Sequence, residues 1–244
     1  MKWGSFGPVH IATLILGAVM IAGLYLLLRK ASRKTQTWVL GVLSFSGIAA
    51  VIFNLLMWNS PLEYLPLHLC SINAMLLPIV VFTRSKTLGN LLLVWCLGAL
   101  AALVVNMAQA EYELFSWTFV FYYFPHVFEF GIPILLFALG IIEKHPKYIL
   151  RTLAITMLIY TGVHLCNLGI NACCIANNVV DSAGEVIQVN YMYSITPENP
   201  LLALFKQLIP YDYWYMYMIV PILVVYLSVV YLPQILKSRK KSAV

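Results

Sequence analysis

Three side chains that could do chemistry open one apolar segment of this 244-residue chain. The segment reads "EYLPLHLCSIN" from Glu63 and contains His68, Cys70 and Asn73. A cysteine becomes a good nucleophile when a histidine or a helix N-terminus favours its thiolate form. Because Cys70 closely follows Pro66, a residue type that starts helices, the positive end of a helix should lie near its thiol. Cys70 is therefore a candidate nucleophile.

The adjacent histidine is poorly placed to act as its base. Residues two apart on a helix point about 200° away from each other, so His68 and Cys70 should not meet. Cys70 and Asn73, three apart, share a helical face. Unless the helix starts irregularly, the base must come from another helix.

The best candidate for that base is His126 in "FYYFPHVFEFGIPIL". It follows Pro125, and Glu129 lies one turn further on, where a carboxylate can orient or charge the ring. His164, in a later apolar segment, is the alternative base.

Two other readings of Cys70 stay open. Buried cysteines are usually small inert hydrophobic residues. A metal site built from His68, Cys70 and a third ligand is only weakly favoured, because the chain has no Cys-x-x-Cys or His-Glu-x-x-His spacing. We expect no metal and no cofactor.

Composition identifies the setting of these residues. The chain is 62% hydrophobic and 10% charged, with a mean hydropathy of +0.87, whereas soluble domains are about a quarter charged. The net charge of +6 comes from short basic clusters beside apolar runs. Such clusters are typical of membrane topology signals, so we expect a multi-pass protein of the cell membrane and no nucleic-acid partner.

Seven apolar segments are long enough to approach the roughly 20 residues that cross a bilayer. The sequence predicts an all-α membrane protein, a bundle of seven transmembrane helices forming a single domain over residues 1–244. The first run is too long for the apolar part of a signal peptide, so we expect it to remain as a span. The segments are Pro8–Leu28, Trp38–Trp58, Pro66–Phe82, Leu88–Met107, Phe115–Ile142, Ile149–Ile170 and Tyr213–Leu232.

The charge of the connections alternates and predicts the orientation. With seven spans, the basic clusters around Lys30, Lys86 and Lys147 and the basic tail all lie on one side. By the positive-inside rule the N-terminus is outside and the C-terminus is cytoplasmic. The longest loop, at about residues 171–211, is then external, and its "EVIQVNYMY" run favours a strand or a flap.

With this orientation, intramembrane polar residues gather in the outer half of the membrane. A single such residue usually forms a contact that holds two helices together. Several at one depth indicate a polar cavity, which we expect to open outward. Asn190 and Tyr191, in the external loop, could cap this cavity or hold a headgroup. Besides Cys70 and the two candidate bases, the predicted supporting residues are His10, Asn54, His68, Asn73, Asn106 and Glu129.

Four stretches carry a family resemblance: "YLPLHLCSINAMLLPIVVFTRSK", "FYYFPHVFEFGIPIL", "NYMY" and "YDYWYMYMIVPIL". Together they resemble the YwaF family of bacterial integral membrane proteins, which includes the animal transmembrane-protein-164 branch. The resemblance implies seven helices. It also implies a relation to acyltransferases that act on ether lysophospholipids and, distantly, to androgen-induced membrane hydrolases of fatty-acid esters. On that basis Cys70 would accept the acyl group and His126 would be its base.

The predicted function is that of a membrane lipid acyltransferase or ester hydrolase, with a phospholipid or fatty acyl ester as substrate. The alternative is a transporter or lipid-binding protein that uses the same cavity without catalysis. Glu129 near the midplane fits a transporter, but seven spans do not divide evenly into repeats. A receptor or structural role would require only packing polarity.

Overall fold

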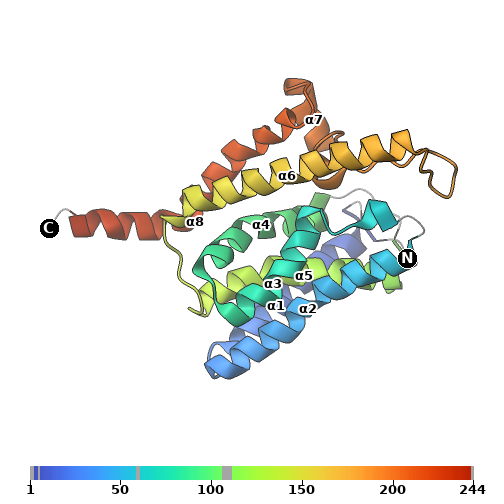
Figure 1. Ribbon diagram of the computed structural model, residues 1–244. Helices are drawn as coiled ribbons and strands as arrows, with labels where there is room; N and C mark the ends of the chain where they lie inside the picture. Colours follow the sequence, from blue (N-terminus) through green and yellow to red (C-terminus); the bar gives the residue numbers. More distant parts are fainter. Residues whose placement is uncertain (1–2, 5, 59–60, 106–111, 243–244) are drawn as a thin grey trace. The chain divides into compact units, whose positions relative to one another are not determined.

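The computed structural model describes residues 3–4, 6–58, 61–105 and 112–242 (Figure 1). Within these ranges the secondary structure is helical apart from isolated bridge residues, of which Val180 and Val186 form an antiparallel pair. The prediction of an all-α fold is therefore confirmed.

Six helical segments in the described ranges are long and apolar enough to cross a membrane, which makes the chain a multi-pass membrane protein. The predicted third span, Pro66–Phe82, instead forms a 15-residue helix, α3 (Leu69–Thr83). At 1.5 Å per residue this helix is about 22 Å long, shorter than the roughly 30 Å of a bilayer core. The six are Pro8–Leu28, Arg33–Met57, Lys86–Val105, Trp117–Ala138, Tyr148–Ala176 and Trp214–Leu236.

Contacts divide the chain into two compact units, Met1–Ile142 and Glu143–Val244. The first unit contains α1 (Pro8–Leu28), α2 (Arg33–Met57), the 3-10 helix η1 (Pro61–Tyr64), α3, α4 (Lys86–Val105) and α5 (Trp117–Ala138). The second contains α6 (Tyr148–Ala176), η3 (Tyr191–Tyr193), α7 (Pro200–Leu208), η4 (Trp214–Met218) and α8 (Ile219–Ser242).

Helix α5 is the centre of the first unit, because it contacts each of α1, α2, α3 and α4. Small residues allow the close approach, as is usual between membrane helices. A Cβ atom on Gly131 of α5 would lie 2.6 Å from the Ile21 side chain of α1. A Cβ atom on Gly47 of α2 would lie 2.6 Å from the Cβ of Ala74 on α3 and 3.0 Å from Oε1 of Glu129 on α5. Gly47 thus lets three helices meet at one point.

The starting points of α3 and α5 place the candidate residues. His68 is the N-cap of α3, with extended backbone, so Cys70 lies in the first turn. Ser116 caps α5 by accepting a hydrogen bond from the Phe119 amide (3.1 Å), and His126 follows in the third turn. Pro125 removes one backbone donor from α5 directly before His126.

The second unit corrects the predicted loop in two ways. Helix α6 continues to Ala176, six residues beyond the predicted end at Ile170, so the loop begins at Asn177. The loop also contains a helix that was not predicted, α7, which starts with a proline and is capped by Asn199 through the Leu202 amide (2.9 Å). The "EVIQVNYMY" run forms the isolated bridge at Val186 and then η3.

Candidate active site

Cys70 of α3 and His126 of α5 come together with Glu129, the third member of one cluster. The Cys70 sulfur, a ring nitrogen of His126 and a carboxylate oxygen of Glu129 all lie within 4.8 Å of one another. Cys70 and His126 are partly exposed, whereas Glu129 is 3% exposed. At this spacing one bridging water or a side-chain rotation would connect the thiol to the ring.

The His126 ring is held in one orientation and one tautomer. Its Nδ1 lies 2.7 Å from the carbonyl oxygen of Tyr122, and because a carbonyl only accepts, Nδ1 carries the hydrogen. The ring also stacks on the Tyr122 ring, with centroids 4.2 Å apart and planes 24° apart. In the neutral imidazole, Nε2 is then the nitrogen with a free lone pair, as a general base requires.

Asn73 adds an amide to this cluster. It lies one turn after Cys70 on the same face of α3, beside the Glu129 carboxyl group, and is 1% exposed. The Asn73 amide is close enough to the Glu129 carboxyl group to interact with it, but among the described residues neither amide atom of Asn73 nor Oε2 of Glu129 has a partner in hydrogen-bond geometry. Buried polar atoms are nearly always paired, so these three atoms mark a place where a ligand, water or ion belongs.

His68 is not a member of the three-residue cluster. Its carbonyl oxygen accepts the first helical hydrogen bond of α3, from the Ile72 amide (3.0 Å). The amides of residues 69–71 precede this bond and, as at any helix start, have no carbonyl partner one turn back. They lie in the same first turn as Cys70, where an anion could bind.

The other predicted supporting residues of the first unit have different surroundings. His10 accepts a hydrogen bond at Nδ1 from the Phe6 amide (3.1 Å) and donates from Nε2 to the Leu103 carbonyl (2.7 Å), which favours a structural role. Asn54 is half-buried on α2, two turns from Gly47 on the same face. Asn106 lies outside the described residues.

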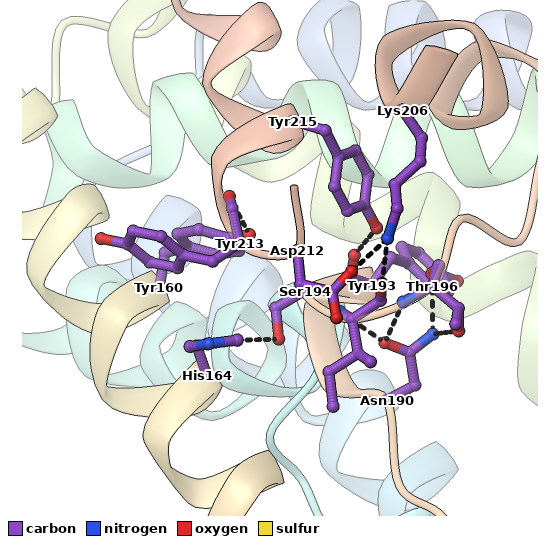
Figure 2. Close-up of polar contacts among 11 residues, drawn as sticks. Tyr160, His164, Asn190, Tyr193, Ser194, Thr196, Lys206, Asp212, Tyr213 and Tyr215 are labelled. Atoms are coloured by element: carbon purple, nitrogen blue, oxygen red, sulfur yellow. Dashed lines mark hydrogen bonds and ion pairs between the residues drawn. The ribbon is translucent and has the colours of Figure 1, made fainter. Parts of the chain in front are cut away.

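His164 belongs to the second unit, where it is part of a hydrogen-bond network (Figure 2). Its Nδ1 lies 2.9 Å from Oγ of Ser194, which also accepts a hydrogen bond from Asn167 Nδ2 (2.8 Å). Asn167 also bonds both backbone groups of Tyr191, at 3.0 Å and 2.8 Å. This network was not predicted. The spacing of Asn167 and Asn171 on one face of α6 is the sequence signal that could have revealed it.

Asn190 and Tyr191 stabilise the loop itself. The Asn190 amide donates to Thr196 and to Glu198 Oε1, and its oxygen accepts from the Ile195 and Thr196 amides. Burial raises the pKa of Glu198 above its ordinary value, and the hydrogen bond from Asn190 opposes that shift. Tyr191 is 1% exposed. A direct contact of these two residues with a headgroup stays a prediction.

The fold and the cluster define a class: a multi-pass helical membrane protein in which a cysteine, a histidine and a buried glutamate lie close together. Within this class the chain belongs to the TMEM164 family, whose model matches residues 5–231. No curated protein and no solved structure matches the chain significantly.

Proposed function

We propose that this protein is a membrane lipid acyltransferase or ester hydrolase with Cys70 as its nucleophile and His126 as its base. The observation that supports this most strongly is that the Cys70 sulfur, a ring nitrogen of His126 and a carboxylate oxygen of Glu129 lie within 4.8 Å of one another. The resemblance to the YwaF family, and through it to acyltransferases and distantly to fatty-acid-ester hydrolases, points to the same chemistry.

The proposed reaction begins when Nε2 of His126 takes the proton of the Cys70 thiol. The thiolate attacks the carbonyl carbon of a fatty acyl ester and forms a tetrahedral intermediate. His126 then returns the proton to the leaving alcohol, and a thioester remains on Cys70. A second alcohol, or water, then loses its proton to His126 and attacks the thioester carbonyl carbon. The C–S bond breaks, the acyl group leaves on the new oxygen, and His126 returns the proton to Cys70.

Two further groups support the charged states along this path. The backbone amides at the start of α3 would stabilise the oxyanion, because helix N-termini present unpaired donors to negative charge. Ionised Glu129 would stabilise the imidazolium form of His126, because opposite charges within a few Å attract strongly in an apolar medium. Asn73 would orient the ester or the attacking water.

The setting we propose is the one that the charge pattern predicts. Helix α3 completes a single seven-helix domain despite its length, with the N-terminus outside, the C-terminus cytoplasmic and residues 171–211 external. The candidate site would then lie in a cavity of the outer half of the cell membrane, which a lipid ester would enter laterally from the bilayer.

Labelling with an alkyne-tagged fatty-acid p-nitrophenyl ester tests the nucleophile. We expect the purified protein to form an adduct that neutral hydroxylamine removes, as it does a thioester. Cys70→Ala should abolish the adduct, and His126→Gln should slow its formation about 100-fold or more, the usual effect of removing a general base. Cys96→Ala is the matched control, because the Cys96 thiol is buried elsewhere on α4 and donates to the Leu93 carbonyl (3.1 Å).

Unchanged labelling of Cys70→Ala would overturn the proposal. Chasing the labelled protein with a lysophospholipid or with water alone then separates a transferase from a hydrolase.

A transporter is the second candidate, favoured by the buried Glu129, whose Oε2 has no described partner. A carboxylate in a span often binds a proton or cation that is coupled to transport. Transport predicts that Glu129→Gln abolishes uptake into proteoliposomes while Cys70→Ala is tolerated. Acyl transfer predicts instead that Cys70→Ala abolishes activity, whereas Glu129→Gln only slows it.

A further inference from the structure

We propose that Cys70, His126 and Glu129 form a binding site for a divalent transition metal ion of the zinc class, and that this ion inhibits acyl transfer. The coordination rests on the geometry of the cluster alone, whereas the inhibition rests on the proposed function.

The three ligand types and their spacing fit such an ion. Thiolate, imidazole and carboxylate are the ligands of Zn²⁺ in proteins, at about 2.0–2.3 Å, which places neighbouring ligand atoms about 3.5 Å apart in a tetrahedron. The cluster is within 4.8 Å before any ion draws it together. Rotation of the Cys70 and Glu129 side chains, which moves their ligand atoms by about 1 Å, brings these atoms to the tetrahedral spacing.

The charges also match. Cys70 and Glu129 as anions bring two negative charges into a setting where an unpaired charge is costly. A divalent cation with these two anions and a neutral imidazole makes a site of zero net charge. On binding, the ion displaces the thiol proton, and the carboxyl proton if present, to the solvent, so affinity should rise with pH.

The second ring nitrogen of His126 has the partner that a metal-binding histidine needs. Histidine ligands usually donate their other N–H to a carboxylate or backbone carbonyl, which fixes the ring and its tautomer. Here Nδ1 donates to the Tyr122 carbonyl at 2.7 Å, which leaves Nε2 for the ion.

Further support comes from unpaired buried atoms within the cluster and beside it. Asn73 and Glu129 are both more than nine-tenths buried, and three of their polar atoms have no partner among the described residues. Three protein ligands leave a fourth position on a tetrahedral ion for a water, which Asn73 is placed to hold.

The functional consequence is that the ion and the acyl group compete for one sulfur. A coordinated thiolate has given its lone pair to the metal, so it attacks an ester slowly. The nitrogen that would take the thiol proton is bound to the same ion.

Cobalt(II) tests the coordination without any assay of activity, because a thiolate bound to Co²⁺ gives charge-transfer absorption in the near ultraviolet. The full chain is purified in detergent with Cys96, Cys166, Cys173 and Cys174 replaced by Ala, which leaves Cys70 as its only thiol. We expect the charge-transfer band on titration with Co²⁺, its loss in Cys70→Ser, and at least tenfold weaker binding in His126→Gln and Glu129→Gln. His145→Gln and Glu198→Gln, which change the same residue types outside the cluster, should bind as before.

The proposal is overturned if the band is absent at saturating Co²⁺ or if it persists in Cys70→Ser. Should the four-alanine variant aggregate, the natural chain and its Cys70→Ser variant give the same comparison as a difference spectrum.

Acyl labelling in the presence of a chelator keeps the two proposals separate. Labelling without a cobalt band overturns the metal site and leaves the acyltransferase standing. A cobalt band without labelling supports the metal site and overturns acyl transfer together with its inhibition. When both are seen, Zn²⁺ should block labelling and the chelator should restore it; labelling that is indifferent to saturating Zn²⁺ overturns the inhibition.

Discussion

At the scale of single residues, the site combines one well-anchored side chain with several unpaired polar atoms. Tyr122 holds His126 by a hydrogen bond and by ring stacking. Asn73 and Oε2 of Glu129 have no partner among the described residues. A buried polar group without a partner costs about 1–3 kcal/mol, so these unpaired atoms lower the free energy of unfolding. Such a cost is typical of sites kept for function.

Asn73→Leu should therefore leave stability unchanged or raise it, while it lowers acyl labelling of Cys70. Leucine has the same branched side-chain shape and the same number of heavy atoms as asparagine, and the Asn73 amide atoms have no hydrogen bond to lose among the described residues. Thermal unfolding of the purified protein in detergent, followed by circular dichroism, measures the first effect.

Asn167→Leu is the matched control for that substitution. Asn167 is equally buried, but its amide bonds Tyr191 and Ser194, so its loss should destabilise the protein by about 2–4 kcal/mol. If Asn73→Leu destabilises the protein as much as Asn167→Leu does, Asn73 is a structural residue and the interpretation of its unpaired atoms is wrong.

At the scale of the elements, the cluster depends on how closely α2 approaches α3 and α5. Gly47→Ala would put a methyl group 2.6 Å from the Ala74 Cβ, 3.2 Å from the Ala74 Cα and 3.0 Å from Oε1 of Glu129. Backbone and carboxylate must both move, so we expect a loss of about 1–3 kcal/mol of stability and a displaced Glu129. Slower labelling of Cys70 and a lower melting temperature are the expected measurements.

Gly23→Ala on α1 provides the comparison, because nothing lies within 4 Å of the added methyl group. It should be neutral or slightly stabilising, since alanine favours helix more than glycine does. Equal effects at the two glycines would show that close packing at Gly47 does not position the cluster.

Much of the helical arrangement could be predicted from hydropathy, because a bilayer-spanning helix needs a long apolar run. Pro8–Leu28 was predicted with the observed bounds. Helix α7 and the last turns of α6 were missed, because the contacts that favour them lie within the loop. Asn171 on α6 shows this: it pairs with the backbone of Val189, which local sequence does not reveal.

The candidate site was partly predictable for a similar reason. Helix periodicity separated His68 from Cys70 and paired Cys70 with Asn73, and these depend only on local geometry. His126 was expected near Cys70 because both residues fall in the outer half of their predicted spans. In the structure both belong to one cluster. The Tyr122 carbonyl as the partner of His126 could not be predicted, because backbone contacts of a side chain leave no pattern in composition.

At the scale of the whole molecule, the proposed seven-span topology requires α3 to cross the membrane. If α3 crosses, the basic connections before α2 and after α3 lie on the same side. Cysteines introduced at Ala31 and Ser85 of a chain without its native cysteines should then both resist a membrane-impermeant maleimide on intact cells. A cysteine at Ser182 should react, because its loop is external in the proposed topology.

Permeabilised cells are the control, and all three positions should react there. Opposite reactivity of positions 31 and 85 on intact cells would mean that α3 does not cross and that the chain has six spans.

The paired asparagines of α6 show how a helix can set the spacing of the loop that packs beside it. Asn167 bonds both backbone groups of Tyr191, and Asn171 bonds both backbone groups of Val189. Four helical residues rise about 6.0 Å, and two residues of a strand would span about 6.6 Å; because Asn190 (φ −140°, ψ 51°) is not fully extended, the step from Val189 to Tyr191 is shorter than that and close to the helical rise. The helical rise of α6 therefore fixes which residues of this part of the loop pair with the two asparagines. A residue inserted between Val189 and Tyr191 would break one of the two pairs even if no existing side chain were changed.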